Sequence, residues 1–305
     1  MQTTIISHRD CLLHEMGSSH PECPQRVEVI DEALRTSEFA DKLDWQEALL
    51  VEKKHLLLVH DKNYVENIYS NSPKTGRLVL DPDTAMNPYT LKAAQRAAGA
   101  LVQATDLVMT GKTKRVFCNV RPPGHHAEHN RAMGFCIFNN IAIGVKYALE
   151  HYGVKKITIV DFDVHHGNGT QDIFQHEDRV EYLSSYQYPF YPFSAVTQHS
   201  SHILHIPLPV GATGQIFRRL AEGIWFPAIA AFQPELIFIS AGFDAHQADP
   251  LAELNFSEAD YAWITEKVVN FADQFSEGRV ISTLEGGYAL EVLGACARAH
   301  VGAMV

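Results

Sequence analysis

The sequence predicts an α/β protein, a three-layer sandwich in which a mostly parallel sheet lies between two layers of helices. Short apolar runs alternate along the chain with helical patterns of about ten or more residues, which is typical of parallel strands joined by helical crossovers. The runs are apolar throughout, as in ITIV at 157–160 and LIFIS at 236–240, which indicates strands buried on both faces. Four such runs lead directly into loops rich in glycine, histidine and acidic residues.

Local patterns predict each element in turn. Pro24 suits the first turn of a helix, to which Val27, Ile30 and Leu34 give one apolar face. A later alanine-rich helix stops at Gly111, and a connection rich in Asp, Asn and Pro precedes it at 73–88. Strands are predicted at 3–7, 115–119, 156–160, 180–183, 202–206, 235–240 and 279–283, and helices at 25–35, 54–69, 89–109, 137–152, 169–176, 213–232, 257–275 and 289–300.

The 305 residues are predicted to form a single domain, residues 1–305, because no linker-like stretch divides them and no repeat is visible. A hydrophobic fraction of 46% is ample for a sizeable core. The formal net charge of −11 argues against a nucleic-acid-binding surface, which needs clustered Lys and Arg. The same charge gives a weak bias toward cationic substrates.

The location is predicted to be cytoplasmic, away from any membrane. The first residues, MQTTIISHRD, lack a basic segment followed by an apolar core, and no apolar run approaches the roughly 20 residues that span a bilayer. The five cysteines form no C-x-x-C pair, so reduced thiols are the simplest account. The sequence does not indicate an oligomeric state.

The segment ITIVDFDVHHGNG at 157–169 gives the strongest indication of a site. Asp163 and His165 stand one residue apart where a strand ends, so both side chains can face one side and share a cation. The carboxyl ends of parallel strands meet at one edge of the sheet, and there the loop AGFDAHQADP offers Asp244 as a third ligand. An isolated Asp after a strand is more often a turn or cap residue, and only the company of the other loops favours a ligand.

The ligand set of Asp163, His165 and Asp244 leaves a position open for water and substrate, as catalytic zinc sites do. A two-metal site would need more bridging carboxylates. Instead, Gly167 stands two residues after His165, and His246 stands two residues after Asp244. One zinc ion per chain is therefore expected, with ferrous iron as the open alternative.

The loop RPPGHHAEHNRAMGF at 121–135 carries two adjacent histidines, His125 and His126, after two prolines and a glycine. Imidazoles beside a metal suit general base and general acid chemistry, because their ordinary pKa is about 6.5. The alternative is that one ligates metal and the other only forms hydrogen bonds. Asp161 and Asn168 are natural partners, because a carboxylate raises the basicity of one histidine and an amide leaves the other easier to deprotonate.

The loop EGGY at 285–288 places Tyr288 after Gly286 and Gly287, which allow the backbone to move near a ligand. A phenol beside a metal can donate a hydrogen bond to a carbonyl that is becoming an oxyanion, a contribution of about 3 kcal/mol. The alternative is an ordinary packed tyrosine at a helix start. Arg26 stands at the start of a predicted helix, where a solvated cation is the ordinary alternative to a role in the site.

These stretches together resemble the histone deacetylase family, including its bacterial deacetylases and acetylpolyamine amidohydrolases. The similarity runs from His20 to Tyr288 and rests on RPPGHHA, GFCIFNN, DFDVHHGNGTQ, SAGFDAH and EGGY. It implies an arginase-like fold with a central sheet of about eight strands. Asn168 stands where class I members have Asp, which, with HPECPQR and RPPGHHAEHN, makes the chain more similar to the class II branch.

The resemblance implies a zinc-dependent amidohydrolase that removes acetyl or a related short acyl group from lysine side chains. In that scheme His126 deprotonates the attacking water, and Tyr288 and the metal stabilise the tetrahedral oxyanion. A histidine then protonates the leaving amine. The positions that match the zinc ligands are Asp163, His165 and Asp244, and those that match the partners of the histidines are Asp161 and Asn168.

A narrow acyl tunnel is also implied, and its rim is expected to differ because Ser185 and Tyr186 replace a Leu-His pair. Asp83 is the candidate to grip the substrate backbone there. The tunnel positions match Gly134, Phe135, Tyr191 (where many relatives carry Phe), Arg26, Gly286 and Gly287. A monovalent-cation site, usually filled by potassium, matches Asp161, Asp163, His165 and Ser184.

Three other functions stay open. The same chemistry could serve acetylated polyamines or other small amides in place of peptides. A protein that binds acyl groups without cleaving them is disfavoured by the intact Tyr288 and both histidines. An arginase-like ureohydrolase is disfavoured by Gly167 and His246.

Overall fold

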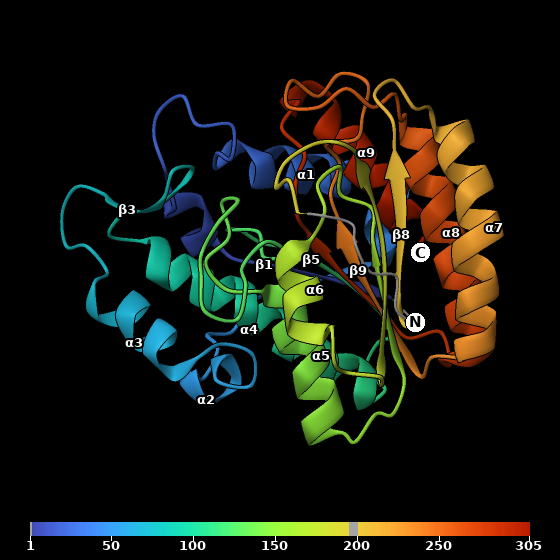
Figure 1. Ribbon diagram of the computed structural model, residues 1–305, viewed down its shortest axis with the longest axis horizontal. Coiled ribbons are helices and arrows are strands. Elements are labelled where there is room, and N and C mark those ends of the chain that lie inside the picture. The colour runs from blue at the N-terminus through green and yellow to red at the C-terminus, as the bar shows by residue number, and fades with distance from the viewer. Residues whose placement is uncertain (1, 195–200) are drawn as a thin grey trace.

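The fold is built on one eight-stranded sheet, in a computed structural model that describes residues 2–194 and 201–305 (Figure 1). The strand order is β2-β1-β5-β10-β9-β6-β7-β8, and every pairing is parallel. The predicted α/β sandwich with about eight mostly parallel strands is therefore confirmed. The strands are β1 (Thr3–Ser7), β2 (Leu43–Glu47), β5 (Arg115–Asn119), β6 (Ile157–Asp161), β7 (Val180–Gln187), β8 (Ile203–Leu208), β9 (Leu236–Ala241) and β10 (Val280–Leu284).

Helices cover both faces of the sheet, with α7 and α8 on one side and α4, α5 and α6 on the other (Figure 1). Alternate strand residues enter two separate hydrophobic clusters: in β9, Phe238 joins one while Ile237 and Ile239 join the other. The helices of the first layer are α1 (Gln25–Arg35), α7 (Gly214–Phe232), α8 (Glu258–Phe275) and α9 (Leu290–Gly302), and those of the second are α4 (Thr90–Met109), α5 (Asn140–His151) and α6 (Asn168–Phe174). None of the helices in the described part of the chain has the length and apolar character to cross a bilayer.

The strand order explains why chemistry gathers at one place. β5 and β6 follow each other along the chain, yet β10 and β9 lie between them in the sheet. The four strands whose ends carry the polar loops are thus four adjacent central strands. In parallel sheets a ligand site forms where loops diverge at the carboxyl ends of such strands.

The prediction of one helix at 54–69 was wrong. Two short helices, α2 (Lys53–Leu56) and α3 (Lys62–Ser70), lie there with a turn between them. His60 in that turn is buried, and its ring accepts the N–H of Asn139, while Asp61 N–H donates to the carbonyl of His129. Tertiary hydrogen bonds to the loop before α5 therefore override the continuous helical pattern.

Three short strands escaped prediction. The connection at 73–88 contains an antiparallel hairpin, β3 (Leu78–Asp81) and β4 (Thr84–Met86), and β2 extends the main sheet beside β1. All three are only three to five residues long, so any alternation in them is too brief to identify a strand. Two 3-10 turns, η1 (Arg9–Leu13) and η2 (Ala40–Lys42), complete the elements.

Candidate active site

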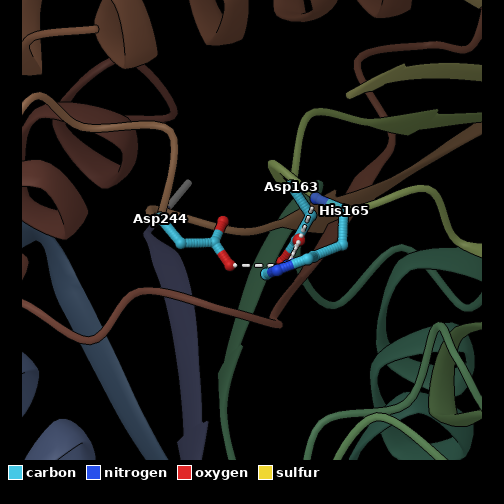
Figure 2. A group of neighbouring side chains, drawn as sticks. All are labelled: Asp163, His165 and Asp244. Atoms are coloured by element: carbon cyan, nitrogen blue, oxygen red, sulfur yellow. Dashed lines mark hydrogen bonds and ion pairs between the residues drawn. The ribbon is translucent and has the colours of Figure 1, made fainter. Parts of the chain in front are cut away.

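Three buried side chains at the ends of β6 and β9 face a common point (Figure 2). One ligand atom each from Asp163, His165 and Asp244 lies within 4.8 Å of the others, and across residues 2–194 and 201–305 no other group of three meets this criterion. His165 Nδ1 lies 3.0 Å from Asp163 Oδ1 and 3.2 Å from Asp244 Oδ2. The three predicted metal ligands are therefore brought together, with the imidazole nitrogen between two carboxylates.

The donor set fits a divalent cation. Asp244 Oδ2 is buried and accepts no hydrogen bond, a costly state for a carboxylate oxygen unless a cation lies against it. Two carboxylate oxygens and one imidazole nitrogen are the ligands that zinc and similar divalent metals accept. Although burial lowers the pKa of His165, the negative carboxylates of Asp163 and Asp244 beside its ring raise that pKa to about 10. The two carboxylates thus attract positive charge strongly at this point.

The neighbouring loops approach this group closely. A Cβ at Gly286 would lie 2.0 Å from Asp244 Oδ2, so only glycine lets the loop after β10 pass this close. His246 turns away from the cluster, and its Nε2 lies 3.7 Å from Glu258. A Cβ at Gly167 would meet the hydroxyl of Tyr182 at 2.3 Å. Neither Gly167 nor His246 adds a ligand.

His125 and His126 follow β5 and stand next to this cluster, with their ring centroids 4.1 Å apart. His125 Nδ1 lies 3.1 Å from Asp161 Oδ2, and His126 Nδ1 lies 2.8 Å from Asn168 Oδ1. Both acceptors are oxygens, since the Asn168 amide nitrogen donates to Glu128 instead. Each imidazole therefore carries its proton on Nδ1 and presents Nε2 toward the site.

The two histidines differ in proton affinity. Burial lowers the pKa of His125, but the nearby carboxylates of Asp163 and Asp161 raise it to about 10. Burial is the largest cause that lowers the pKa of His126, and the positive charges of His125 and His165 lower it further. This pKa therefore falls well below the ordinary value. The surroundings of these two adjacent histidines thus shift their pKa values in opposite directions.

Tyr288 lies on the loop after β10, and its ring makes an edge contact with Phe135, centroid to centroid 5.9 Å. Burial raises the pKa of its hydroxyl well above the ordinary value, and the nearby Arg26 guanidinium opposes this only in part. The phenol is therefore protonated at neutral pH and able to donate. Arg26 itself is fully buried, so the solvated alternative was wrong. Its guanidinium lies 4.9 Å from the Tyr288 ring centroid and donates from Nε to the Gly287 carbonyl at 2.7 Å.

The other predicted tunnel positions surround the histidines. The Tyr191 ring lies edge-on to His126, with centroids 5.3 Å apart. Gly134 has φ of +56°, and a Cβ there would lie 2.3 Å from the His126 ring, so the turn requires glycine. The N–H of Gly134 donates to Asp83 Oδ1 at 3.1 Å. Asp83 thus ties the β3–β4 hairpin to this turn.

Ser184 is buried on β7 directly opposite Asp161 in the strand register. The structure therefore brings Ser184 close to the backbone that ends in the metal ligands. The hydroxyl of Tyr182, on the same strand, donates to Asp161 Oδ2 at 2.8 Å. That second hydrogen bond fixes the carboxylate behind His125, a role that sequence inspection did not assign.

Buried acids near the site also escaped prediction. Glu285 Oε2 accepts the N–H groups of Gly124 and His125 at 2.7 and 3.1 Å. Glu22 joins two fully buried guanidinium groups, those of Arg26 and Arg121. The signal available in the sequence was an acidic residue inside each of the motifs HPECPQR and EGGY.

Comparison with known proteins agrees with this fold. An eight-stranded parallel sheet with polar loops at its carboxyl edge is the arginase-like architecture of deacetylases, and the crystal structure of the HDA15 HD domain superposes with a TM-score of 0.91 at 32% identity, over 99% of this chain and 88% of that one. The family model described as "Histone deacetylase domain" matches residues 20–304. The chain belongs to the histone deacetylase family, and this membership supports a deacetylase, hence hydrolase, function.

Two relatives show how far the similarity extends. A "Probable deacetylase" of Archaeoglobus fulgidus is 34% identical, over 95% of this chain and 82% of its own length. "Histone deacetylase 14, chloroplastic" of Arabidopsis thaliana is 35% identical, over 90% of this chain and 70% of its own length. Both alignments thus extend over nearly all of this chain.

Proposed function

We propose that the chain is a zinc-dependent deacetylase, acting as one domain in the cytoplasm, that hydrolyses acetyl or related short acyl amides of lysine side chains. The observation that supports it is the convergence, at one sheet edge, of a single Asp-His-Asp group with two histidines of opposite pKa shift and one protonated phenol. That set contains a cation site, a proton acceptor, a proton donor and an oxyanion donor.

A zinc ion held by Asp163, His165 and Asp244 would polarise the acyl carbonyl and acidify a water molecule. In the proposed mechanism His126, neutral because its pKa is low, accepts the proton of the attacking water at Nε2. His125 stays protonated through Asp161 and supplies the proton that the leaving amine needs. The Tyr288 hydroxyl donates a hydrogen bond to the carbonyl oxygen as negative charge develops there.

The residues around these groups hold the substrate in the proposed tunnel. Phe135 and Tyr191 are its walls, Gly134, Gly286 and Gly287 let the backbone approach the acyl chain, and Arg26 lies at its inner end. The aromatic walls of such a tunnel favour an extended methylene stem like that of lysine, because the stem can be buried there without an unpaired polar atom.

The test is an assay of purified protein, with bound metal measured, against acetyl-lysine peptides. Release of acetate and free lysine at a rate that follows zinc occupancy is expected. The Asp244→Ala variant serves as the control, because it removes a ligand whose carboxylate lies against the Val164 N–H and the His165 ring. A zinc-loaded protein that releases no acetate from any acylated amine would favour the non-catalytic acyl-binding function.

A second candidate substrate is an acetylated polyamine, because carboxylates lie near the proposed entrance. Burial is the largest cause that raises the pKa of the Tyr191 hydroxyl, and the negative charges of Asp83 and Asp81 raise it further. Negative charge there would attract a second ammonium group. Acetylated diamines and acetyl-lysine peptides compared at equal concentration separate the two substrates, and turnover of the diamines alone would exclude the peptide activity.

We further infer that a potassium ion binds beside the zinc site at Asp161 and Ser184, with Asp163 and His165 contributing. The support is the burial of Asp161 opposite Ser184 in neighbouring strands. A higher melting temperature in potassium chloride than in lithium chloride at equal ionic strength is expected, and equal temperatures would contradict the site.

A further inference from the structure

Helix α9 begins directly after Tyr288 without a cap of its own. Its N-cap residue is Ala289, whose side chain cannot accept a hydrogen bond from the first turn. Asp249, on the loop after β9, fills this role from a distance of 40 residues in sequence. Its Oδ2 accepts the N–H of Tyr288 at 2.7 Å and that of Ala289 at 3.3 Å. A carboxylate also suits the positive end of the helix dipole.

Asp249 is itself held firmly. Its side chain is buried, its Oδ1 accepts the N–H of Leu251 at 3.0 Å, and its own N–H donates to the His246 carbonyl at 2.9 Å. It stands five residues after Asp244, on the same loop. The loop that supplies the third metal ligand thus also fixes the backbone of Tyr288.

The Tyr288 side chain has few restraints of its own. No hydrogen bond joins its hydroxyl to another residue within 2–194 or 201–305, and its ring contacts are those with Phe135 and Arg26. The preceding Gly287 has φ of +119°, a conformation open to glycine and strained for other residues. Direction of the phenol therefore depends on how the backbone is held on either side of this glycine.

Before that glycine, Gly286 N–H donates to Asp163 Oδ2 at 2.8 Å. The peptide group that joins Gly287 to Tyr288 is held at both ends, because its carbonyl accepts from Arg26 and its N–H donates to Asp249. Without Asp249, this peptide group would be held at its carbonyl end alone. We propose that Asp249 is a positioning residue that aims the Tyr288 hydroxyl at the substrate carbonyl. This inference rests on the proposed deacetylase function for its effect on rate.

The variants Asp249→Ala and Asp249→Asn test this, because the asparagine amide retains one oxygen that can accept the Tyr288 and Ala289 N–H groups, while the bond to the Leu251 N–H is lost in both variants. We expect Asp249→Ala to lower kcat at least tenfold with KM changed less than twofold and zinc retained, and Asp249→Asn to recover most of the rate. In a Tyr288→Phe background, Asp249→Ala is expected to change kcat less than twofold, because the hydroxyl it aims is already gone. Equal losses in both backgrounds would overturn the proposal.

A matched control distinguishes loss of Tyr288 positioning from loss of helix capping alone. Asp260 is 6% exposed, as is Asp249, and it accepts the N–H of Ser257 at the start of α8, away from the site. Asp260→Ala should lower the melting temperature without lowering kcat. An Asp260→Ala variant that loses kcat as Asp249→Ala does would assign the effect to lost helix stability.

A measurement without substrate keeps this inference distinct from the proposed function. In protein labelled with 3-fluorotyrosine, the fluorine resonance of Tyr288 is identified by its loss in Tyr288→Phe. We expect that resonance to broaden or divide in Asp249→Ala and to return to one line in Asp249→Asn. An unchanged resonance in Asp249→Ala overturns the positioning role, whereas absence of turnover with a changed resonance overturns only the deacetylase proposal.

Discussion

The loop after β5 and the loop after β10 hold their active side chains in opposite ways. In the first, each imidazole has its own partner, Asp161 for His125 and Asn168 for His126. In the second, Tyr288 is directed through its backbone, by Asp249 and by the arginine bond to Gly287. Side-chain partners set protonation and tautomer, whereas backbone anchors set only position.

This difference follows from what each group has to do. A proton acceptor and a proton donor need unlike pKa values, and only a charged or neutral partner beside the ring can supply them. A hydrogen-bond donor such as a phenol is already protonated, so its position decides its contribution. The tandem histidines are therefore expected to be sensitive to the charge of their partners, and the tyrosine to the anchoring of its loop.

The largest effect is expected from removal of a metal ligand, because both loops converge on the proposed metal site. Asp244→Ala should abolish zinc retention and reduce turnover to background, because two ligands do not hold a divalent ion tightly. His125, His126 and Tyr288 stay in place. Bound zinc is measured by mass spectrometry after dialysis. Full zinc stoichiometry in Asp244→Ala would contradict the ligand set.

Replacement of the phenol tests the second loop alone. Tyr288→Phe should lower kcat about 100- to 1000-fold, the usual effect of losing an oxyanion donor, while KM changes little. Zinc content and the pH profile should stay as in the unmodified protein, because the histidines are untouched. Steady-state kinetics with an acetyl-lysine peptide measure both constants, and equal losses in affinity and turnover would exclude the oxyanion role.

An exchange of partner tests the first loop. Asn168→Asp places a carboxylate behind His126, as Asp161 is behind His125, and should raise the pKa of His126 by roughly one to three units. Because the base acts in its neutral form, a higher pKa moves the acid limb of kcat/KM to higher pH. Activity at the acid end of the pH profile should fall relative to the unmodified protein and recover as the pH rises. An acid limb that does not move would show that His126 is not the base.

Much of the fold was predictable because it depends on strong local patterns. The strand at 115–119 and the helix at 25–35 have the predicted bounds, since a continuous apolar run and a proline start leave little choice. Asp163, His165 and Asp244 could be grouped because each directly follows a strand of one parallel sheet. For residues at strand ends, the sequence can therefore indicate which other residues lie nearby.

The elements that could not be predicted depend on distant partners. The turn at His60 exists because of bonds to Asn139 and Glu128, and no local pattern contains them. Asp249 looks like an ordinary loop acid beside a proline, and only the folded chain shows that it caps a helix from another segment. Local sequence carries propensity, while these contacts form only when two loops meet.

The smallest expected effect concerns Glu285, which links the two loops. Its carboxyl group accepts the N–H groups of Gly124 and His125, and burial raises its pKa to about 7 despite those bonds. Glu285→Gln resembles the protonated form and keeps an acceptor oxygen, so we expect kcat within about threefold and little loss of stability. Glu285→Ala leaves two buried N–H groups unpaired and should lower the free energy of unfolding by about 2 to 3 kcal/mol, measured in urea. If Glu285→Gln instead abolished activity, the negative charge of Glu285 would matter as much as its geometry, and Glu285 would act with Asp161 and Asp163 on the pKa of His125.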